Sequence, residues 1–231
     1  MSATSFKKNA FFQSIWKTMQ ENTYFSIVFL IYIILGGLTL LLLNQGDLLL
    51  YFSENRAPFW NVFFSYGTKL GEEWTYIFLL VFFLFIRFRY ALLIPITGII
   101  VTLISFLSKN FFLHPRPSTY YKALGMFEDI NLVDGIFVVK GLSSFPSGHT
   151  MSGFAIFTLT ALLISNKKEM AFFLFTLALI VGISRVYLVQ HFLKDIYLGS
   201  IMGVFIAFII FKVQHLLPIS EQHWINKKLL F

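Results

Sequence analysis

The sequence predicts an all-α fold, a six-transmembrane-helix bundle with one amphipathic helix at the membrane interface. Of the 231 residues, 57% are hydrophobic and only 13% are charged, whereas soluble domains carry about 25% charged residues. The mean hydropathy is +0.76, and phenylalanine alone occurs 30 times. Apolar runs of roughly the 20 residues that a helix needs to cross a bilayer recur along the chain. A single membrane domain over residues 1–231 is therefore expected.

The six predicted spans follow one another with short connections, except for one long loop in the middle of the chain. A helix whose ends lie in the interface can cross with slightly fewer than 20 apolar residues. Glu72 and Glu73 interrupt the second run, so we place them at its outer edge. The spans are Tyr24–Leu43, Leu70–Ile86, Tyr90–Leu107, His149–Ile164, Met170–Tyr187 and Asp195–Phe211.

The segments between the spans complete this layout. Residues 1–23 form a cytosolic or interfacial N-terminal segment, residues 112–147 an outer loop, and residues 212–231 a cytosolic tail. The stretch Ala57–Leu70 is amphipathic, which is typical of a helix that lies along the interface. In Gly199–Gly203 (GSIMG), small residues four apart predict close packing of the last span against a neighbouring helix.

The distribution of Lys and Arg predicts that both termini lie in the cytosol. Ten of the 18 basic residues fall on the connections of one side and eight on those of the other. Lys109, Arg116 and Arg185 belong to the eight, but they are also part of the chemical motifs of the chain. Five remain without them, and the side richer in Lys and Arg is the cytosolic one. In a bacterium this places the chain in the inner membrane, with the outer loop facing the periplasm.

Composition also excludes several classes of function. The chain has no cysteine, which excludes disulfides, thiolate metal sites and cysteine nucleophiles. The net charge of +7 is typical of cytosolic loops in a membrane protein, and no basic aromatic motif indicates a nucleic-acid partner. No cleavable signal peptide is evident, because the first apolar run is long enough to span by itself.

Three polar stretches interrupt the apolar pattern at the outer ends of spans three to six. The first closes span three, the second opens span four, and the third connects spans five and six. If the spans alternate in direction, all three lie on the same side of the membrane and can converge on one site. The stretches are Lys109–Pro117 (KNFFLHPRP), Pro146–His149 (PSGH) and Ser184–Asp195 (SRVYLVQHFLKD).

The cations of these stretches indicate an anion site. Lys109, Arg116 and Arg185 have few acidic residues beside them in sequence, and ionisable groups near membrane spans are costly unless they have a function. The arginine fork suits an oxyanion with several oxygens, and lysine acts as a point charge. Three such cations predict a bound phosphate dianion. For any one of them alone, snorkelling to lipid headgroups stays an equal alternative.

The second stretch predicts a helix start that can bind an anion. Ser147 stands at the N-cap position of an apolar helix, and capping alone is one interpretation. The alternative uses the same geometry, because the free N–H groups of Gly148 and His149 and the helix dipole attract an anion. Gly148 also lets the backbone approach without an intervening side chain.

The histidines supply groups for acid–base and nucleophilic chemistry. His191 and Asp195 are four residues apart, which on a helix places them on one face. A carboxylate bonded to one imidazole nitrogen leaves the other free to attack, although an isolated pair is more often structural. His149, beside the cations, suits a general acid that protonates the leaving oxygen. His114 occupies no position that this chemistry requires, and we expect it at the rim.

Taken together, the three stretches resemble the motifs of the type 2 phosphatidic acid phosphatase (PAP2) family of membrane phosphatases. Lysine, six residues, arginine and proline fit the first motif at Lys109–Pro117. Pro146–His149 and Ser184–Asp195 fit the second and the third. They occur in the expected order and spacing, and the six-span layout agrees over most of the chain.

The resemblance implies a metal-independent phosphatase, without a cofactor, that acts on lipid phosphates in a bilayer. It implies that His191 attacks and forms a phosphohistidine, that Asp195 orients His191, and that His149 protonates the leaving group and later helps water attack. The residues that it places around the phosphate oxygens are Lys109, Arg116, Ser147, Gly148 and Arg185.

Three other functions are compatible with parts of the pattern. A vanadate-dependent haloperoxidase shares the anion site and motif order, but such relatives are soluble. A non-enzymatic lipid transporter or sensor needs cations but no nucleophile. The third is a metal hydrolase using His114, His149, His191 and the acidic residues of the loop. Harder divalent cations prefer more carboxylates, however, and zinc sites need three well-spaced ligands.

The substrate is left open among several outer-leaflet lipids. Phosphatidic acid, phosphatidylglycerol phosphate, undecaprenyl diphosphate and lipid A phosphates all present a phosphate at the membrane surface. Under the resemblance, the N-terminal segment and the loop over residues 112–143 are the variable parts, and headgroup selection is expected there.

Overall fold

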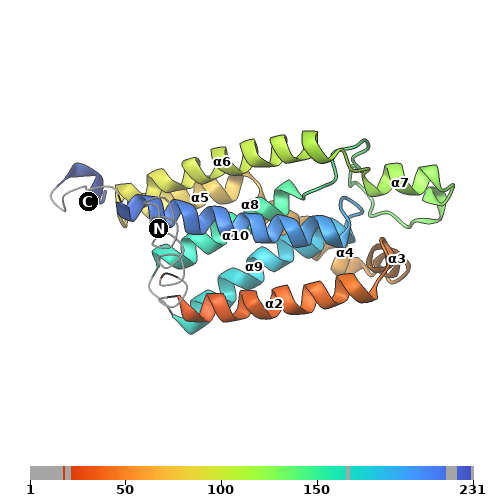
Figure 1. The fold of residues 1–231 in the computed structure, drawn as a ribbon, viewed down its shortest axis with the longest axis horizontal. Helices are drawn as coiled ribbons and strands as arrows, with labels where there is room; N and C mark the ends of the chain where they lie inside the picture. Colours follow the sequence, from red (N-terminus) through yellow and green to blue (C-terminus); the bar gives the residue numbers. More distant parts are fainter. Residues whose placement is uncertain (1–17, 19–21, 165–166, 217–222, 230–231) are drawn as a thin grey trace, which may run out of the picture.

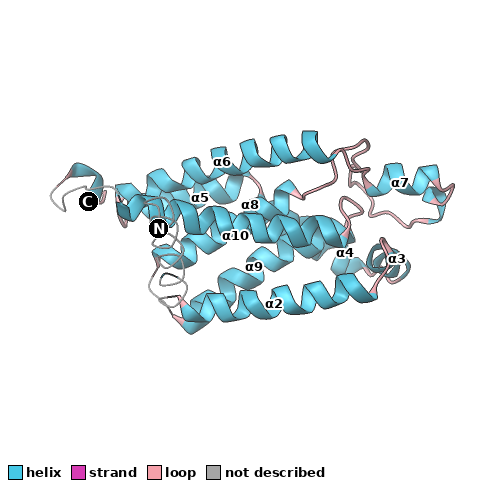
Figure 2. Ribbon diagram, viewed as in Figure 1, coloured by secondary structure: helices cyan, strands magenta, loops and turns pink. Residues whose placement is uncertain are grey.

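The structure is a computed structural model that describes residues 18, 22–164, 167–216 and 223–229. Within these residues the chain forms helices joined by turns and loops, and no strand is present (Figure 2). The all-α prediction is therefore confirmed for the described part of the chain.

Every predicted span coincides with a helix, and several short helices were not predicted. The helices at the predicted spans are α2 (Thr23–Leu42), α5 (Glu73–Leu84), α6 (Phe88–Phe112), α8 (Gly148–Leu163), α9 (Lys168–Tyr187) and α10 (Leu193–Leu216). The shorter elements are α3 (Asp47–Glu54), α4 (Pro58–Gly67), η1 (Thr68–Gly71), α7 (Pro117–Ala123), η2 (Phe127–Asp129) and η3 (Trp224–Asn226).

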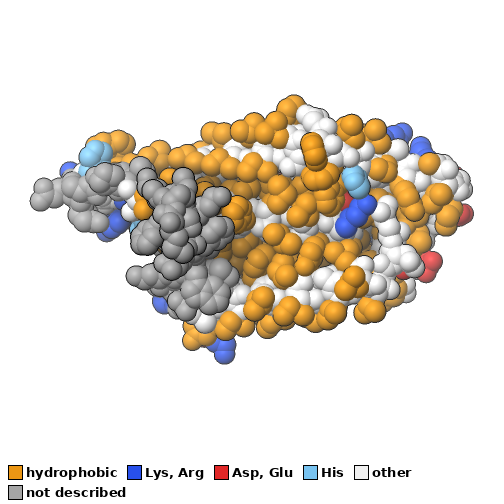
Figure 3. Space-filling model, in the orientation of Figure 1, with side chains coloured by type: hydrophobic (Ala, Val, Ile, Leu, Met, Phe, Trp, Pro, Cys, Tyr) orange, Lys and Arg blue, Asp and Glu red, His pale blue; other side chains and the backbone are white. Residues whose placement is uncertain are grey.

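Four helical stretches are long and apolar enough to cross a membrane, namely α2, the stretch Phe88–Ala123 that contains α6, α9 and α10. Helices α5 and α8 are shorter, with 12 and 16 residues, so the count of six spans stays a prediction. Hydrophobic side chains cover the visible face of the bundle, while Lys, Arg, Asp and Glu gather near its ends (Figure 3). The chain is an integral membrane protein.

A helix also occupies the stretch for which an interfacial helix was predicted. Helix α4 exposes Phe59, Trp60 and Tyr66 and buries Phe64 and Gly67. This one-sided exposure suits an interface. The position of α4 relative to a bilayer stays a prediction, as does the sidedness of the termini.

Helix α8 forms the centre of the bundle and packs against α9 and α10 (Figure 1). The two glycines of the predicted packing motif explain its contact with α10. A Cβ at Gly203 would lie 2.4 Å from the Met151 carbonyl oxygen, and one at Gly199 would lie 2.7 Å from that of Ser147. The prediction of close packing is confirmed, and the contact at Gly199 fixes the first turn of α8 against α10.

One end of the bundle gathers the polar stretches of the sequence. Helix α6 ends there, α8 and α10 begin there, and α3, α4 and α7 surround the same end (Figure 1). We call it the loop end. The described part of the tail, at η3, lies at the opposite end, where the Phe88 N–H donates to the Lys227 carbonyl.

Candidate active site

All eight residues singled out in the sequence lie at the loop end, on five helices and on the link before the last of them. Each is held where a helix begins or ends, because the polar stretches connect the helices. Lys109 lies in the last turn of α6, Arg116 is the N-cap of α7, Ser147 is the N-cap of α8, Gly148 and His149 begin α8, Arg185 lies in the last turn of α9, His191 lies between α9 and α10, and Asp195 lies in the first turn of α10. The expected convergence of the three stretches is therefore observed.

His191 and Asp195 form the most buried pair of the site. His191 Nδ1 lies 3.3 Å from Asp195 Oδ2, and the side chains are 1% and 0% exposed. The spacing suggested that the two residues share one face of a helix. They do not, because α10 begins only at Leu193. Their contact instead depends on a turn, in which the Phe192 N–H donates to Asp195 Oδ2 at 2.9 Å. The carboxylate thus caps α10 and orients the imidazole at once.

The link between α9 and His191 has an unusual backbone shape. Val189 has a φ of 58°, a left-handed conformation that is costly for a β-branched residue. It lets the Arg185 carbonyl accept from the N–H groups of both Gln190 and His191, at 2.9 and 3.1 Å. Such strain often occurs at functional sites. Here it directs the His191 ring inward immediately after the helix ends.

His191 is neutral under ordinary conditions. Burial lowers the pKa of its imidazole to about 3, the nearby Arg116 and Arg185 act in the same direction, and the hydrogen bond to Asp195 acts in the opposite one. Since Nδ1 faces the carboxylate, it carries the proton, and the lone pair of Nε2 faces the other way. His191 Nε2 lies 3.0 Å from Arg116 Nη1. The ring therefore has the tautomer of a nucleophile beside a fixed cation.

Arg116 connects the outer loop to this link. Its Nη1 also donates to the Gln190 carbonyl at 3.0 Å, and its Nε donates to Ser143 Oγ at 3.3 Å. The side chain is only 6% exposed. These bonds hold the guanidinium against His191.

Arg185 lies nearby with one donor unused. It is 8% exposed, and its Nη1 donates to Thr68 Oγ1 of η1 at 2.7 Å. Its Nε is buried without an acceptor among the described residues. A buried donor without a partner costs about 1–3 kcal/mol. Arg185 is therefore prepared for an anion at this point.

The start of α8 shows the capping role of Ser147, and its role in binding an anion stays a prediction. Its Oγ accepts from the Thr150 N–H at 3.4 Å and from Thr150 Oγ1 at 2.9 Å, so it caps the helix. A Cβ at Gly148 would lie 2.7 Å from Ser105 Oγ and 3.4 Å from Lys109 Nζ. The backbone of α8 therefore approaches the Ser105 hydroxyl of α6 closely only because Gly148 has no side chain, and the Lys109 ammonium lies beside this contact.

His149 faces a cavity and is surrounded by charge. It lies in the electrostatic field of Lys109, Arg116, Arg185 and His191. Its side chain is 38% exposed, and Nε2 lies 3.6 Å from Glu72 Oε1. Within the described residues, no group of three His, Cys, Asp or Glu side chains is arranged to hold a metal ion.

Four side chains of this site were missed in the sequence. Ser144 Oγ donates to Asp195 Oδ2 at 2.5 Å. The other three are Ser143, Thr68 and Glu72. Ser143 and Ser144 directly precede Pro146–His149, which was the one available signal. Thr68 and Glu72 precede α5 and carry no motif, and Glu72 served only to mark the edge of a span.

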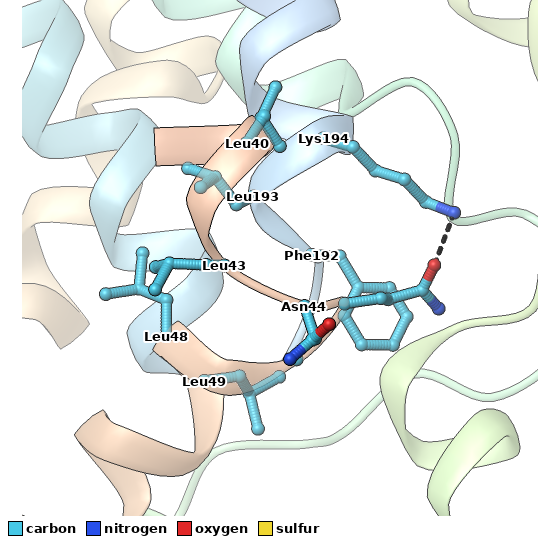
Figure 4. A pocket seen from close by; sticks show the side chains of 10 residues that line it. Leu40, Leu43, Asn44, Leu48, Leu49, Phe192, Leu193 and Lys194 are labelled. Atoms are coloured by element: carbon cyan, nitrogen blue, oxygen red, sulfur yellow. Dashed lines mark hydrogen bonds between the residues drawn. The ribbon is translucent and has the colours of Figure 1, made fainter. Parts of the chain in front are cut away.

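His114 lies at the rim of the site, beside a separate small cavity. His114 Nδ1 lies 3.3 Å from Lys194 Nζ, which donates to Gln45 Oε1 at 2.7 Å. A cavity of about 330 Å³ lies here between α2, α3 and the start of α10, and leucines form much of its lining (Figure 4). None of the eight residues lines it.

A larger cavity reaches the site from the side of the bundle. It has a volume of about 980 Å³ and lies between α5, α6 and α8. Lys109, Gly148 and His149 line one part, and Pro95 on α6 lines another. The fourteen residues from Pro95 to Lys109 correspond to about 21 Å along a helix. Because the lining residues Ile99 and Phe106 are 68% and 61% exposed, the cavity lies open to the apolar outer surface of the bundle.

Comparison with known proteins gives a consistent family. The model of the PAP2 superfamily matches residues 87–218. Lipid phosphate phosphatase 1 of Arabidopsis thaliana is 28% identical over 130 residues, which are 48% of this chain and 40% of that protein. Phosphatidylglycerophosphatase B of Bacillus subtilis (strain 168) is 35% identical over 75 residues, which are 29% of this chain and 37% of that protein. The matched segments thus span about two fifths of the length of these relatives.

Solved structures agree in fold. Aquifex aeolicus LpxE matches with a TM-score of 0.61 and 28% identity, over 73% of this chain and 94% of that chain. The transmembrane PAP2-type phosphatidylglycerolphosphate phosphatase of Bacillus subtilis matches with a TM-score of 0.60 and 21% identity, over 83% of this chain and 96% of that chain. At this lower identity the second match shows the fold alone.

Proposed function

The chain belongs to the PAP2 superfamily, and we propose that it is a metal-independent phosphatase that removes phosphate from a membrane lipid through a phosphohistidine. One observation carries the proposal. A neutral, fully buried His191 is held by Asp195 beside Arg116 and Arg185, and Lys109 lies in the electrostatic field of the same two arginines and of Asp195. A protein that only binds lipid phosphate needs the cations but not the oriented imidazole.

The phosphate is bound by the cations and by the start of α8. Lys109, Arg116 and Arg185 neutralise the dianion, and the unpaired Nε of Arg185 donates to one oxygen. Ser147 and Gly148 contribute the hydroxyl and the free N–H groups of the helix start. Phosphoryl transfer depends mainly on such positioning and on stabilising charge on the oxygens.

In the first step, His191 Nε2 attacks phosphorus and the bond from phosphorus to the lipid oxygen breaks. In the structure Arg116 Nη1 lies 3.0 Å from Nε2. When the phosphate binds, Nη1 donates to a phosphate oxygen instead, because a charged acceptor binds a guanidinium more strongly than a neutral imidazole does. Asp195 stabilises the positive charge that develops on the ring. His149 gives its proton to the departing oxygen, so that the lipid leaves as an alcohol.

In the second step, water displaces His191 from phosphorus. His149, which has lost its proton, takes one from the attacking water. The nitrogen–phosphorus bond breaks, inorganic phosphate leaves, and both histidines return to their initial states. No metal ion is needed in either step, so activity is expected to survive EDTA.

The large cavity suggests how a lipid reaches the site. Its polar part holds Lys109 and His149, and its apolar part along α6 lies open to the outer surface. A lipid bound with its phosphate at α8 can keep its chains along α6 without leaving the bilayer. This arrangement favours a lipid phosphate over a soluble phosphate ester.

The substrate belongs to the phosphorylated lipids of the outer leaflet. Among the relatives, the names of two refer to phosphatidylglycerol phosphate and one to lipid phosphates in general. Phosphatidylglycerol phosphate, phosphatidic acid, undecaprenyl diphosphate and lipid A phosphates are therefore the compounds to compare. The predicted location is a bacterial inner membrane, with the loop end facing the periplasm and both termini in the cytosol.

Phosphate release from each of these lipids by the purified protein in mixed micelles tests the activity. Brief incubation with ³²P-labelled substrate and an alkaline quench, which preserves phosphohistidine, tests the intermediate. We expect label on the wild-type chain and none on His191→Ala, while His215→Ala, altered at the opposite end of α10, stays labelled. A fully active His191→Ala variant would contradict the proposed mechanism.

A further inference from the structure

Glu72 is the carboxylate that contacts His149. Its Oε1 lies 3.6 Å from His149 Nε2, and the two side chains are 30% and 38% exposed. Both residues line the large cavity. Glu72 lies outside the segment 87–218 that matches the PAP2 superfamily. Its contact with the site is therefore a feature that the three motifs do not contain.

The turn that carries Glu72 is attached firmly to the first turns of α8. A Cβ at Gly71 would lie 2.9 Å from the His149 carbonyl oxygen, so only glycine allows this approach. The Gly71 carbonyl also accepts from Ser152 Oγ at 2.7 Å, and Ser152 lies one turn after His149 on α8. These two backbone contacts of Gly71 thus fix the position of Glu72 relative to His149. The contact between the two side chains does not depend on chance surface conformations.

The backbone of Glu72 is fixed as well. Its N–H donates to the Lys69 carbonyl at 3.1 Å, and its carbonyl accepts from the Thr75 N–H at 3.2 Å. Tyr76, one turn into α5, adds a third connection, because its hydroxyl lies 3.0 Å from Ser152 Oγ. The carboxylate can therefore move only through its own side-chain torsions.

The surroundings of His149 explain why a carboxylate is needed here. The groups that face it are Lys109 from α6, Arg116 from the start of α7, Arg185 from α9 and His191 from the link before α10. Burial disfavours a proton on the imidazole, and the three cations among these groups act in the same direction. A general acid must carry that proton when the substrate is bound. A carboxylate at short distance offsets part of this repulsion and orients the ring.

We propose that Glu72 is a positioning residue for His149, holding the protonated ring in the direction of the leaving oxygen. This inference rests on the proposed phosphatase function. When the phosphorus–oxygen bond breaks, the proton moves from His149 to the lipid oxygen, and Glu72 neither gains nor loses one. The distance of 3.6 Å is longer than a hydrogen bond, and such contacts commonly tighten only when the substrate is bound.

The nature of the leaving group separates this role from all others. A lipid leaves as an alkoxide, which needs the proton, whereas p-nitrophenyl phosphate releases a stable phenolate that does not. Removing a general acid costs about 10²–10⁴-fold in rate, and removing its orientation costs less. We expect Glu72→Gln to lower kcat roughly 10-fold or more on a short-chain phosphatidic acid. Glu72 also interacts electrostatically with Arg185. On p-nitrophenyl phosphate we still expect a change of less than about 3-fold, because the phosphate-binding side chains themselves are retained.

The matched controls use the same two substrates. Glu54→Gln removes an exposed carboxylate of α3 at the same end of the molecule and is expected to leave both rates unchanged. Glu72→Asp keeps the charge but shortens the side chain, and we expect an intermediate loss on the lipid alone. Folding of both variants is judged by size-exclusion chromatography in detergent. If Glu72→Gln does not fold, the rates of Glu72→Asp on the two substrates test the proposal.

Two results would overturn the inference while leaving the proposed function intact. If the Glu72 variants lose both rates equally, Glu72 acts on phosphate binding or folding. If they lose neither, Glu72 has no part in catalysis. Failure of the proposed function gives a different result, in which the wild type releases no phosphate or His191→Ala keeps its activity on both substrates.

Discussion

Ser144 Oγ donates a 2.5 Å hydrogen bond to Asp195 Oδ2, and both side chains are completely buried. The same oxygen accepts from the Phe192 N–H and faces His191 Nδ1. Three donors on one oxygen fix the direction of the carboxylate, and through it the direction of the His191 ring. The loop before α8 and the start of α10 are thus connected through Asp195, the carboxylate that faces the proposed nucleophile.

Ser144→Ala is therefore expected to lower kcat about 10-fold and to leave KM nearly unchanged, because the phosphate-binding side chains do not touch Ser144. It is also expected to destabilise the protein by about 1.5–3 kcal/mol, the usual net contribution of a hydrogen bond to a charged group. Phosphate-release kinetics and thermal unfolding in detergent measure the two effects. Ser143→Ala serves as the comparison, with a smaller effect expected because its 3.3 Å bond to Arg116 is one of several. A Ser144→Ala variant with wild-type kcat would show that Asp195 needs no support.

Arg185→Ala is expected to lower kcat/KM by about 10²–10³-fold, the usual effect of removing one donor to a developing oxyanion. The reason is its buried Nε, which has no acceptor among the described residues. Arg116→Ala is expected to lose at least as much, since Arg116 also contacts His191. Arg87→Gln, at the opposite end of the bundle, is the control and is expected to keep wild-type rates. If Arg185→Ala retains wild-type turnover, the phosphate does not bind where the cations converge.

Thr102→Trp is expected to raise the KM for a long-chain lipid phosphate about 10-fold, because an indole would fill part of the cavity that Thr102 lines on α6. The rate with a short-chain, water-soluble analogue is expected to stay within about 2-fold, since its chains do not extend along α6. The first estimate follows from the loss of apolar contact area, at about 25 cal/mol per Å². Thr176→Trp on α9 lies outside this cavity and serves as the control. Equal effects on both chain lengths would indicate that the lipid chains lie elsewhere.

The stability of the protein is expected to fall as the pH drops from 6.5 toward 4. The pKa of His191 is lowered from 6.5 to about 3 by burial, so in this range the unfolded chain binds a proton that the folded chain does not. Stability conferred by the neutral ring is complete above pH 6.5 and declines below it, by at most about 1.4 kcal/mol per pH unit. Unfolding midpoints measured at each pH are expected to fall less steeply for His191→Gln. Parallel curves for the two proteins would exclude His191 as the cause.

The same pKa predicts that His191 does not limit activity near neutral pH. A histidine with an ordinary pKa would lose its nucleophilic form between about pH 7 and 5. Because burial keeps His191 neutral, the acid side of the kcat/KM profile is expected to carry no inflection from this residue. A profile that falls with a midpoint near pH 6.5 in the wild type, and that shifts when Asp195 is replaced by Asn, would contradict this.

Much of the fold could be predicted because long apolar runs in the sequence identify membrane helices. Long apolar runs located α2, α6, α9 and α10, and two glycines four apart identified the face of α10 that packs on α8. The short helices α3 and α7 were not predicted, since neither has an apolar run of sufficient length. The lengths of α5 and α8 did not follow from the pattern either. An apolar run keeps the same hydropathy whether or not the residues at its ends are helical.

The sequence by itself determined which polar and charged groups meet at the loop end of this protein. Lys109, His149, Arg185 and His191 stand at helix ends that alternation brings to one side, and that conclusion needs only the order of the spans. Only the tertiary structure decided how these groups are held. His191 contacts Asp195 through a turn and not along a helix, and Ser144, Thr68 and Glu72 support the site from segments without a motif. The physical reason is that a hydrogen bond depends on distances of a few tenths of an ångström, which packing of helices far apart in sequence sets and local sequence patterns do not.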